Sequence, residues 1–396
     1  MIEAKNSQIR MDLECRVDSL VTDLSHGLGK VAAGFVKDVL LGMELAHSPR
    51  LSDIARALEE KIGLRATHKR LSRNAARSEL APIVSDNLLQ LAASHVHDDT
   101  LLVLDWPNLL KNRAEKMENL NVITDTKGNP VGKGYHLAEV VASEVDSDNI
   151  TPLSQAIWPE IDPETDFLSH TLELVARVRK AIGGNKGIIV ADRSADHMGL
   201  LGPWTEDSTC RYLVRLRGRT ELMFRRQIVT ASELADGCDT PYGKNVLNIG
   251  QHGPKPEFLH FGYKSARLPV APDRPLSLVV VRGVSPEPVT LLTTEPMRDN
   301  RAVLTALVEA YCRRWRIMST KLRFYERHQL SRIRVLGFDR IRNLAILEFA
   351  LVYLHTLLHD EAGSDVGAFD AIQVVEEGID LYRVPQTEKR SISDPS

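Results

Sequence analysis

The chain has 396 residues, 43% of them apolar and 26% charged, which excludes a wholly disordered or collagen-like chain and predicts two or three folded units. Fifty Lys and Arg against 53 Asp and Glu give a formal net charge of −3, but the charge is unevenly placed. Residues 61–78 hold six Lys or Arg and no acid, and residues 311–342 hold ten against two acids. Basic blocks of this kind favour contact with a polyanion.

The cysteines and the apolar runs bear on where in the cell the protein is expected. The four cysteines are far apart and form no C-x-x-C pair, so the pattern predicts neither a disulfide framework nor a structural zinc site. The first twenty residues lack the apolar centre of a signal peptide, and no uninterrupted apolar run reaches about 18 residues. We expect a cytoplasmic protein that makes no membrane contact.

Residues 1–97 are predicted to form an all-helical DNA-binding domain, because apolar residues recur there at helical spacing. Ser52 is expected to cap one helix, and Gly63 to end it in the left-handed conformation. A basic helix follows, so the segment has the parts of a helix-turn-helix. The alternative is an ordinary helical hairpin with a solvated basic face. The candidate DNA-binding residues of this helix are Arg65, Lys69, Arg70, Arg73 and Arg77.

Residues 98–385 are predicted to form an α/β domain, in which short buried strands alternate with helices. A β-rich insert is expected at 218–296, followed by long helices from residue 300 onward and a polar tail at 386–396. The expected strands of the α/β part are 101–106, 137–145, 152–158, 186–192 and 211–217, with a helix over 166–182.

Two acids, Asp105 and Asp192, each close a buried strand. A carboxylate at such a place is usually solvated, paired with a cationic side chain or bound to a cation, because burying it unpaired is unfavourable. Two such acids on neighbouring strands, followed by a very basic helix, favour a divalent-metal site that acts on phosphodiesters. Mg²⁺ takes hard oxygen ligands, and a pair of such ions stabilises both the attacking and the leaving oxygen.

Six motifs follow one another in an order that resembles bacterial insertion-sequence transposases of the DDE class, and the match is nearest to their cut-and-paste, IS-four type. They are LLVLDW, YHLAEVV, GIIVADRSAD, RYLVRLRG, YCRRWRI and LSRIRVLGFDRIRNLAIL. The resemblance implies an RNase H-like mixed sheet with flanking helices, Mg²⁺ or Mn²⁺ as cofactor, double-stranded DNA as partner and a dimer on DNA. It also implies that Asp105 and Asp192 are the first two catalytic, metal-binding acids and that the helix at Tyr311 carries the third.

The third position departs from the family signature Y-x2-R-x3-E-x6-K. Tyr311 and Arg314 fit it, but Met318 stands at the Glu position and Tyr325 at the Lys position. A thioether is a poor ligand for Mg²⁺, and Glu326 lies about 80° around the helix from Met318. Three hypotheses stay open: a working transposase that recruits another acid, a decayed copy that binds DNA without cutting it, and a repurposed DNA-binding regulator.

The remaining candidates each have two interpretations. On the helix at Tyr311, the basic side chains either bind DNA phosphates together with Tyr311 or are merely solvated; they are Arg313, Arg314 and Arg316. Asp196 is expected to be a surface acid or a helix cap, and His136 to be structural. Trp106 is expected to pack beneath the acids.

Overall fold

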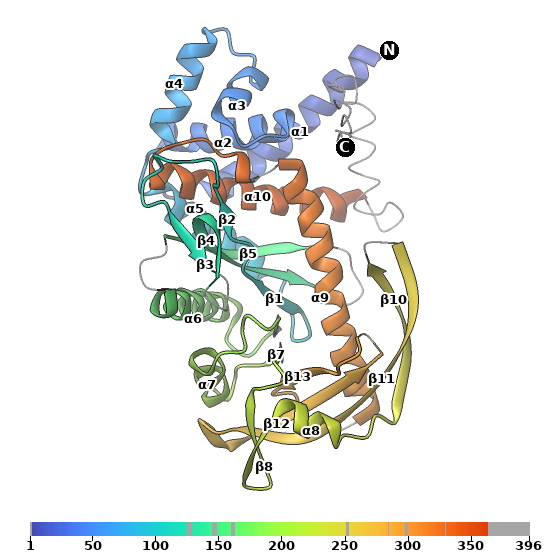
Figure 1. The fold of residues 1–396 in the computed structure, drawn as a ribbon. Helices are drawn as coiled ribbons and strands as arrows, with labels where there is room; N and C mark the ends of the chain where they lie inside the picture. The colour runs from blue at the N-terminus through green and yellow to red at the C-terminus, as the bar shows by residue number, and fades with distance from the viewer. Residues whose placement is uncertain are drawn as a thin grey trace, which may run out of the picture.

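The computed structural model describes residues 2–124, 129–144, 149–159, 163–250, 253–283, 285–297, 300–328 and 330–362. Figure 1 shows helices of the first hundred residues at one end of the molecule, a sheet in the middle and a β-rich part at the other end. The chain is therefore a mixed α/β protein with a mixed sheet and flanking helices, as the sequence predicts at that level.

The N-terminal part is helical throughout its described residues, as predicted. Two local predictions are wrong. Ser52 lies inside the third helix, whose N-cap is Arg50. That helix ends earlier than its apolar pattern suggests, so the left-handed residue is Glu59 (φ 49°), and Gly63 is extended (φ −62°, ψ 141°) at the N-cap of the next helix. The five helices are α1 (Ile2–Leu24), α2 (Lys30–Ala46), α3 (Leu51–Ala57), α4 (Leu64–Asn74) and α5 (Leu80–Ala93).

The central strands run in the order β5-β4-β1-β6-β7. β4 is antiparallel to both β5 and β1, whereas β1, β6 and β7 are parallel to one another. The five predicted strands are confirmed as β1 (Leu101–Asp105), β4 (Pro130–Ser143), β5 (Thr151–Trp158), β6 (Ile188–Ala191) and β7 (Tyr212–Arg215).

Two further strands, β2 (Leu109–Leu110) and β3 (Asn121–Thr124), pair with the outer half of β4. They escape prediction because they are only two and four residues long, too short to show an apolar alternation.

Helices cover the central strands. α6 (Pro163–Ile182) contacts β4 and β5, and α7 (Met198–Glu206) follows β6. In Figure 1, α6 and α7 are drawn to the left of these strands, and α9 (Asn300–His328) runs down their right side. α10 (Phe338–Ala362) contacts α2, α5 and β5.

The predicted β-rich insert is present, and it continues the central sheet because β13 pairs antiparallel with β7. Its one described helix, α8 (Ala231–Asp236), begins with a capping box between Thr230 and Glu233. The strands of the insert are β8 (Glu221–Phe224), β9 (Gln227–Thr230), β10 (Tyr242–Gly250), β11 (Gly253–Leu268), β12 (Ala271–Arg282) and β13 (Val289–Thr293).

A buried lysine fastens the connection between α9 and α10. Lys111, which is 5% exposed, donates from Nζ to three backbone carbonyls of residues 330–333, at 3.1, 2.8 and 3.0 Å. Burial, with a smaller contribution from Arg334, lowers the pKa of Lys111 to about 7. These hydrogen bonds connect the end of β2 to the segment that joins α9 and α10.

One hydrophobic core runs from the N-terminal helices through the sheet to α10, so the helical part and the α/β part share buried residues. Within the described residues, α10 alone is long and apolar enough to cross a membrane, over Phe338–Leu358, but 78% of that stretch is buried inside the protein. Such burial is typical of a core helix. The domain boundary at residues 97 and 98 stays a prediction.

Candidate nucleic-acid interface

One side of α4 is a basic stripe. Thr67 and Leu71 are buried toward the neighbouring helices, which turns the opposite side of α4 to solvent. Arg65, Lys69 and Arg73 are exposed there. Because they are spaced four residues apart, they follow one stripe that extends about 12 Å along the helix. Within the described part of the chain, no carboxylate lies at ion-pair distance from any of the three.

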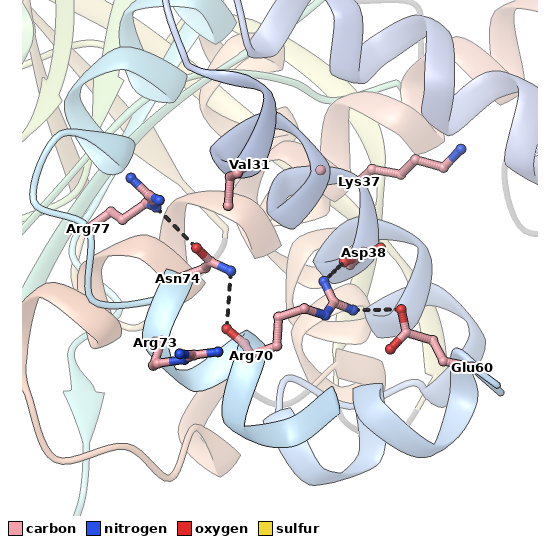
Figure 2. Close-up of a pocket in the computed structure, with 9 residues that line it drawn as sticks. Val31, Lys37, Asp38, Glu60, Arg70, Arg73, Asn74 and Arg77 are labelled. Carbon is pink, nitrogen blue, oxygen red and sulfur yellow. Dashed lines mark hydrogen bonds and ion pairs between the residues drawn. The ribbon is translucent and has the colours of Figure 1, made fainter. Parts of the chain in front are cut away.

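Arg70 faces the other way, into a groove of about 730 Å³ between α2 and α4. Figure 2 shows its guanidinium between Asp38 on α2 and Glu60 in the turn before α4, at 2.5 and 2.7 Å. Thr67 donates a second hydrogen bond to Glu60. Burial raises the pKa of Asp38, and the hydrogen bond from Arg70 opposes that rise. Arg70 is thus paired with two carboxylates, and its ion pair with Asp38 links α4 to α2.

Two other cations of this groove, Arg77 and Lys37, are also compensated, whereas Arg73, which lines the groove at the edge of the stripe, has no carboxylate partner among the described residues. Arg77 lies beyond the end of α4, where it donates to Asn74 at 3.1 Å and pairs with Glu79 at 3.2 Å. Lys37 pairs with Asp18 at 2.5 Å. Of the five basic residues predicted on this helix, the structure therefore leaves Arg65, Lys69 and Arg73 available to an external anion.

The two strand-end acids come from neighbouring strands, as the sequence predicts. β1 and β6 are parallel, with Leu101 opposite Ile188 and Val103 opposite Val190. Two residues further along this register, Asp105 and Asp192 reach the same level at the carboxyl ends of the two strands. Asp105 is the last residue of β1, and Asp192 follows β6 directly. Both are partly buried.

The loop that follows β6 is held by hydrogen bonds to two carboxylates, those of Asp192 and Asp196. Asp192 Oδ1 accepts a hydrogen bond from the backbone N–H of Ser194 at 2.8 Å. Asp196 is 7% exposed and accepts from the backbone N–H of Arg217 and the hydroxyl of Thr220. Burial raises its pKa, while these hydrogen bonds oppose the rise. The expectation of a surface acid or helix cap is therefore wrong: Asp196 anchors the chain where the β-rich insert begins.

A third carboxylate that the sequence interpretation missed lies beside Asp105. Glu139 on β4 is directly opposite Asp105 in the antiparallel ladder, is fully buried, and accepts a hydrogen bond from Gln155 at 2.7 Å. The signal that could have found it is the single acid inside the apolar motif YHLAEVV.

The described residues do not form a complete metal site. Asp105 and Asp192 offer the oxygen donors that Mg²⁺ and Mn²⁺ prefer. However, no group of three or more His, Cys, Asp and Glu in the described part of the chain is arranged to hold a metal ion.

The candidate residues of α9 that are described lie inside the protein. Tyr311 is 5% exposed, and Arg313 and Arg314 are 6% and 3% exposed. Tyr311 Oη accepts a hydrogen bond from Arg215 on β7 at 3.1 Å, and the Arg314 guanidinium lies 5.8 Å from the centre of the Tyr311 ring. These side chains are not part of the exposed surface. The side chains of Arg316 and Met318 lie outside the described residues.

Aromatic side chains pack around the strand ends. Trp106, next to Asp105, donates from Nε1 to Thr171 at 3.2 Å, and its ring lies 5.4 Å from that of Phe167 on α6. His136 stacks on Trp158 at 5.5 Å. His136 thus packs against an aromatic ring, and Trp106 packs against α6; its expected place beneath the acids stays a prediction.

No protein-family model matches this chain, and no curated protein matches it. Among solved structures, the chain is similar to a piggyBac transposase in a synaptic complex with hairpin DNA, with a TM-score of 0.48 and 10% identity. The similarity covers 88% of this chain and 70% of that one. At this level the likeness carries no argument about the present chain.

Proposed function

We propose that this chain is a DNA-binding protein of transposase descent, built on an RNase H-like sheet. The support for the sheet type is its strand order, β5-β4-β1-β6-β7, with β4 antiparallel to the other four strands. Asp105 and Asp192, which the resemblance to DDE transposases makes the first two catalytic residues, stand at the same level at the ends of the neighbouring strands β1 and β6. We also propose a dimer on DNA and a cytoplasmic location.

The observation that carries the DNA-binding proposal is the uncompensated stripe of Arg65, Lys69 and Arg73. Several other cations of the N-terminal helices have acidic partners, namely Arg10 with Glu59, Lys37 with Asp18 and Arg56 with Asp53, whereas exposed Lys30 and Lys61 have none among the described residues. A helix face that is merely solvated can carry cations that pair with neighbouring carboxylates. A face that binds DNA needs cations without such partners, because these can contact the phosphates. In a helix-turn-helix the second helix enters the major groove, and α4 is the second helix of the pair α3 and α4.

DNA binding without strand cleavage is the function that the described residues support best. Strand cleavage is the second candidate, favoured by the acid pair at the ends of β1 and β6. In that case Mg²⁺ or Mn²⁺ would supply charge stabilisation at the phosphodiester, and Asp105 and Asp192 would hold the ion. The position of Met318 in the family signature argues against full activity.

The test is a salt titration of binding to a mixed-sequence DNA duplex, followed by fluorescence anisotropy. Each lost phosphate contact reduces the slope of log affinity against log salt by about 0.9. Replacing all three stripe residues with Ala should therefore reduce that slope by up to about 2.7. A matched control removes three exposed cations from other surfaces and should keep the wild-type slope; it combines Lys180→Ala, Lys186→Ala and Arg301→Ala.

Two outcomes contradict the proposal. If the wild-type protein does not bind the duplex at low salt, the DNA-binding function is wrong. If the stripe variant and the control lose the same amount of affinity, binding depends on overall charge and not on α4.

A further inference from the structure

The hairpin β8–β9 turns through two adjacent arginines in an unfavourable backbone conformation. Phe224 pairs with Gln227, so Arg225 and Arg226 are the two residues of the turn. Their φ angles are 50° and 68°. Two-residue hairpin turns with positive φ at both positions favour Asn-Gly or Gly-Gly, because in the left-handed region Cβ crowds the following carbonyl oxygen, which Gly avoids and Asn tolerates through local hydrogen bonds.

The structure offers no internal reason for arginine at these positions. Both side chains are exposed. The one contact described for them is the guanidinium of Arg225 over the ring of Phe224, 5.1 Å from its centre. Within the described residues, no carboxylate lies at ion-pair distance from either arginine. The turn thus holds two positive charges where a neutral pair would fit the backbone better, which is typical of a site that serves binding.

The charge of the surrounding hairpin has the same sign. Arg219, which precedes β8, is exposed, and residues 217–230 contain four arginines and one acid, Glu221. The hairpin projects from the β-rich end of the molecule, opposite the end that carries α3 and α4 (Figure 1). Its arginines and the stripe on α4 therefore cannot contact the same short stretch of a ligand.

We propose that the Arg225–Arg226 turn is a second contact with the sugar-phosphate backbone of double-stranded DNA, separate from α4. This inference rests on the proposed function. Guanidinium groups suit this partner because they donate paired hydrogen bonds to phosphate oxygens. A two-residue turn at the tip of a hairpin can present both groups to one backbone without interference from the rest of the sheet. A duplex that touches both sites would extend along the molecule.

The deciding variant combines Arg225→Asn with Arg226→Gly, because it removes both charges and places the preferred pair in the turn. A purely structural role predicts that this variant is more stable and binds DNA as before. Our inference predicts that it is more stable and binds DNA more weakly. Arg225→Lys with Arg226→Lys is the matched control, since it keeps the charge and the disfavoured turn.

The readouts are thermal unfolding and the affinity for a mixed-sequence duplex between about 50 and 200 mM salt. A fourfold rise in salt weakens binding by about 3.5-fold for each phosphate contact. Over this range, the salt-induced loss of affinity should therefore be about 12-fold smaller for the Asn-Gly variant than for the wild type. The lysine variant should behave like the wild type.

An unchanged salt dependence in the Asn-Gly variant, with normal wild-type binding, overturns the role of the hairpin and leaves the α4 proposal intact. The same holds if the variant changes only the oligomeric state, which would assign the turn to contact between copies. If the wild type does not bind DNA, the proposed function itself fails.

Discussion

Replacing Arg70 with Ala tests whether this residue stabilises the fold or binds DNA. Both roles are open from the sequence, because Arg70 belongs to the same basic helix as Arg65, Lys69 and Arg73. In the structure its guanidinium joins Asp38 and Glu60 at 2.5 and 2.7 Å, and the three side chains are 30%, 23% and 30% exposed. An exposed ion pair contributes about 0.2–1 kcal/mol, whereas removing one partner of a fully buried pair costs about 3–5 kcal/mol. For this partly buried pair of contacts we expect a loss of about 1–3 kcal/mol in the free energy of unfolding.

The loss should depend on pH in a defined direction. Burial already raises the pKa of Asp38, and without Arg70 nothing in this pair opposes that rise. A carboxyl whose pKa is higher in the folded than in the unfolded state binds more protons when folded, so its unfavourable effect grows as pH rises above the unfolded value near 4. The deficit of Arg70→Ala should therefore be full at about pH 7 and smaller near pH 4.

Urea unfolding at these two pH values measures the deficit, and anisotropy with duplex DNA measures binding. Arg70→Met combined with Asp38→Asn is the control: it removes Arg70 together with the charge of Asp38, while Glu60 keeps its hydrogen bond from Thr67, so most of the stability should be recovered. Wild-type stability together with a loss of DNA affinity as large as that of Lys69→Ala would refute the reasoning, because Arg70 would then be a phosphate ligand.

Three further predictions concern other parts of the chain. The first compares the wild type with Lys111→Met. The wild type should gain free energy of unfolding relative to the variant between about pH 7 and 10, because a lysine whose pKa is lowered to about 7 in the folded state favours folding more as pH increases. Urea unfolding measures this difference, and a difference that does not change with pH would contradict the burial argument. Asp196→Ala should lower the free energy of unfolding by about 1–3 kcal/mol, since two donors lose their acceptor, whereas a loss below the error of calorimetry would show that the insert does not need this anchor. The wild type should cleave plasmid DNA very weakly with Mg²⁺ or Mn²⁺, because a missing transition-state ligand reduces rates by about 10²–10³. Met318→Glu should restore part of this activity, and Asp105→Asn should remove it again; strong wild-type cleavage that Glu326→Gln abolishes would mean that the third acid has moved.

Much of the fold follows from local patterns in the sequence. The apolar runs that end in Asp105 and Asp192 predict two buried strands, and the structure has them as neighbours in parallel register. The four-residue spacing of Arg65, Lys69 and Arg73 places them on one side of a helix before any packing is known. These features depend on backbone periodicity and on the order of elements along the chain, and both are visible in the sequence.

The tertiary structure alone decided which charged groups are available. Arg70 is paired with Asp38, 32 residues away, so it differs from Arg73 although both belong to the same basic run. Tyr311 and its neighbouring arginines are buried by the packing of α9 on the sheet. Glu139 faces Asp105 because β4 folds back on β1. Each of these outcomes is a pairing or a burial between segments far apart in the chain, and the free energy of a charge depends on such neighbours rather than on its own place in the sequence.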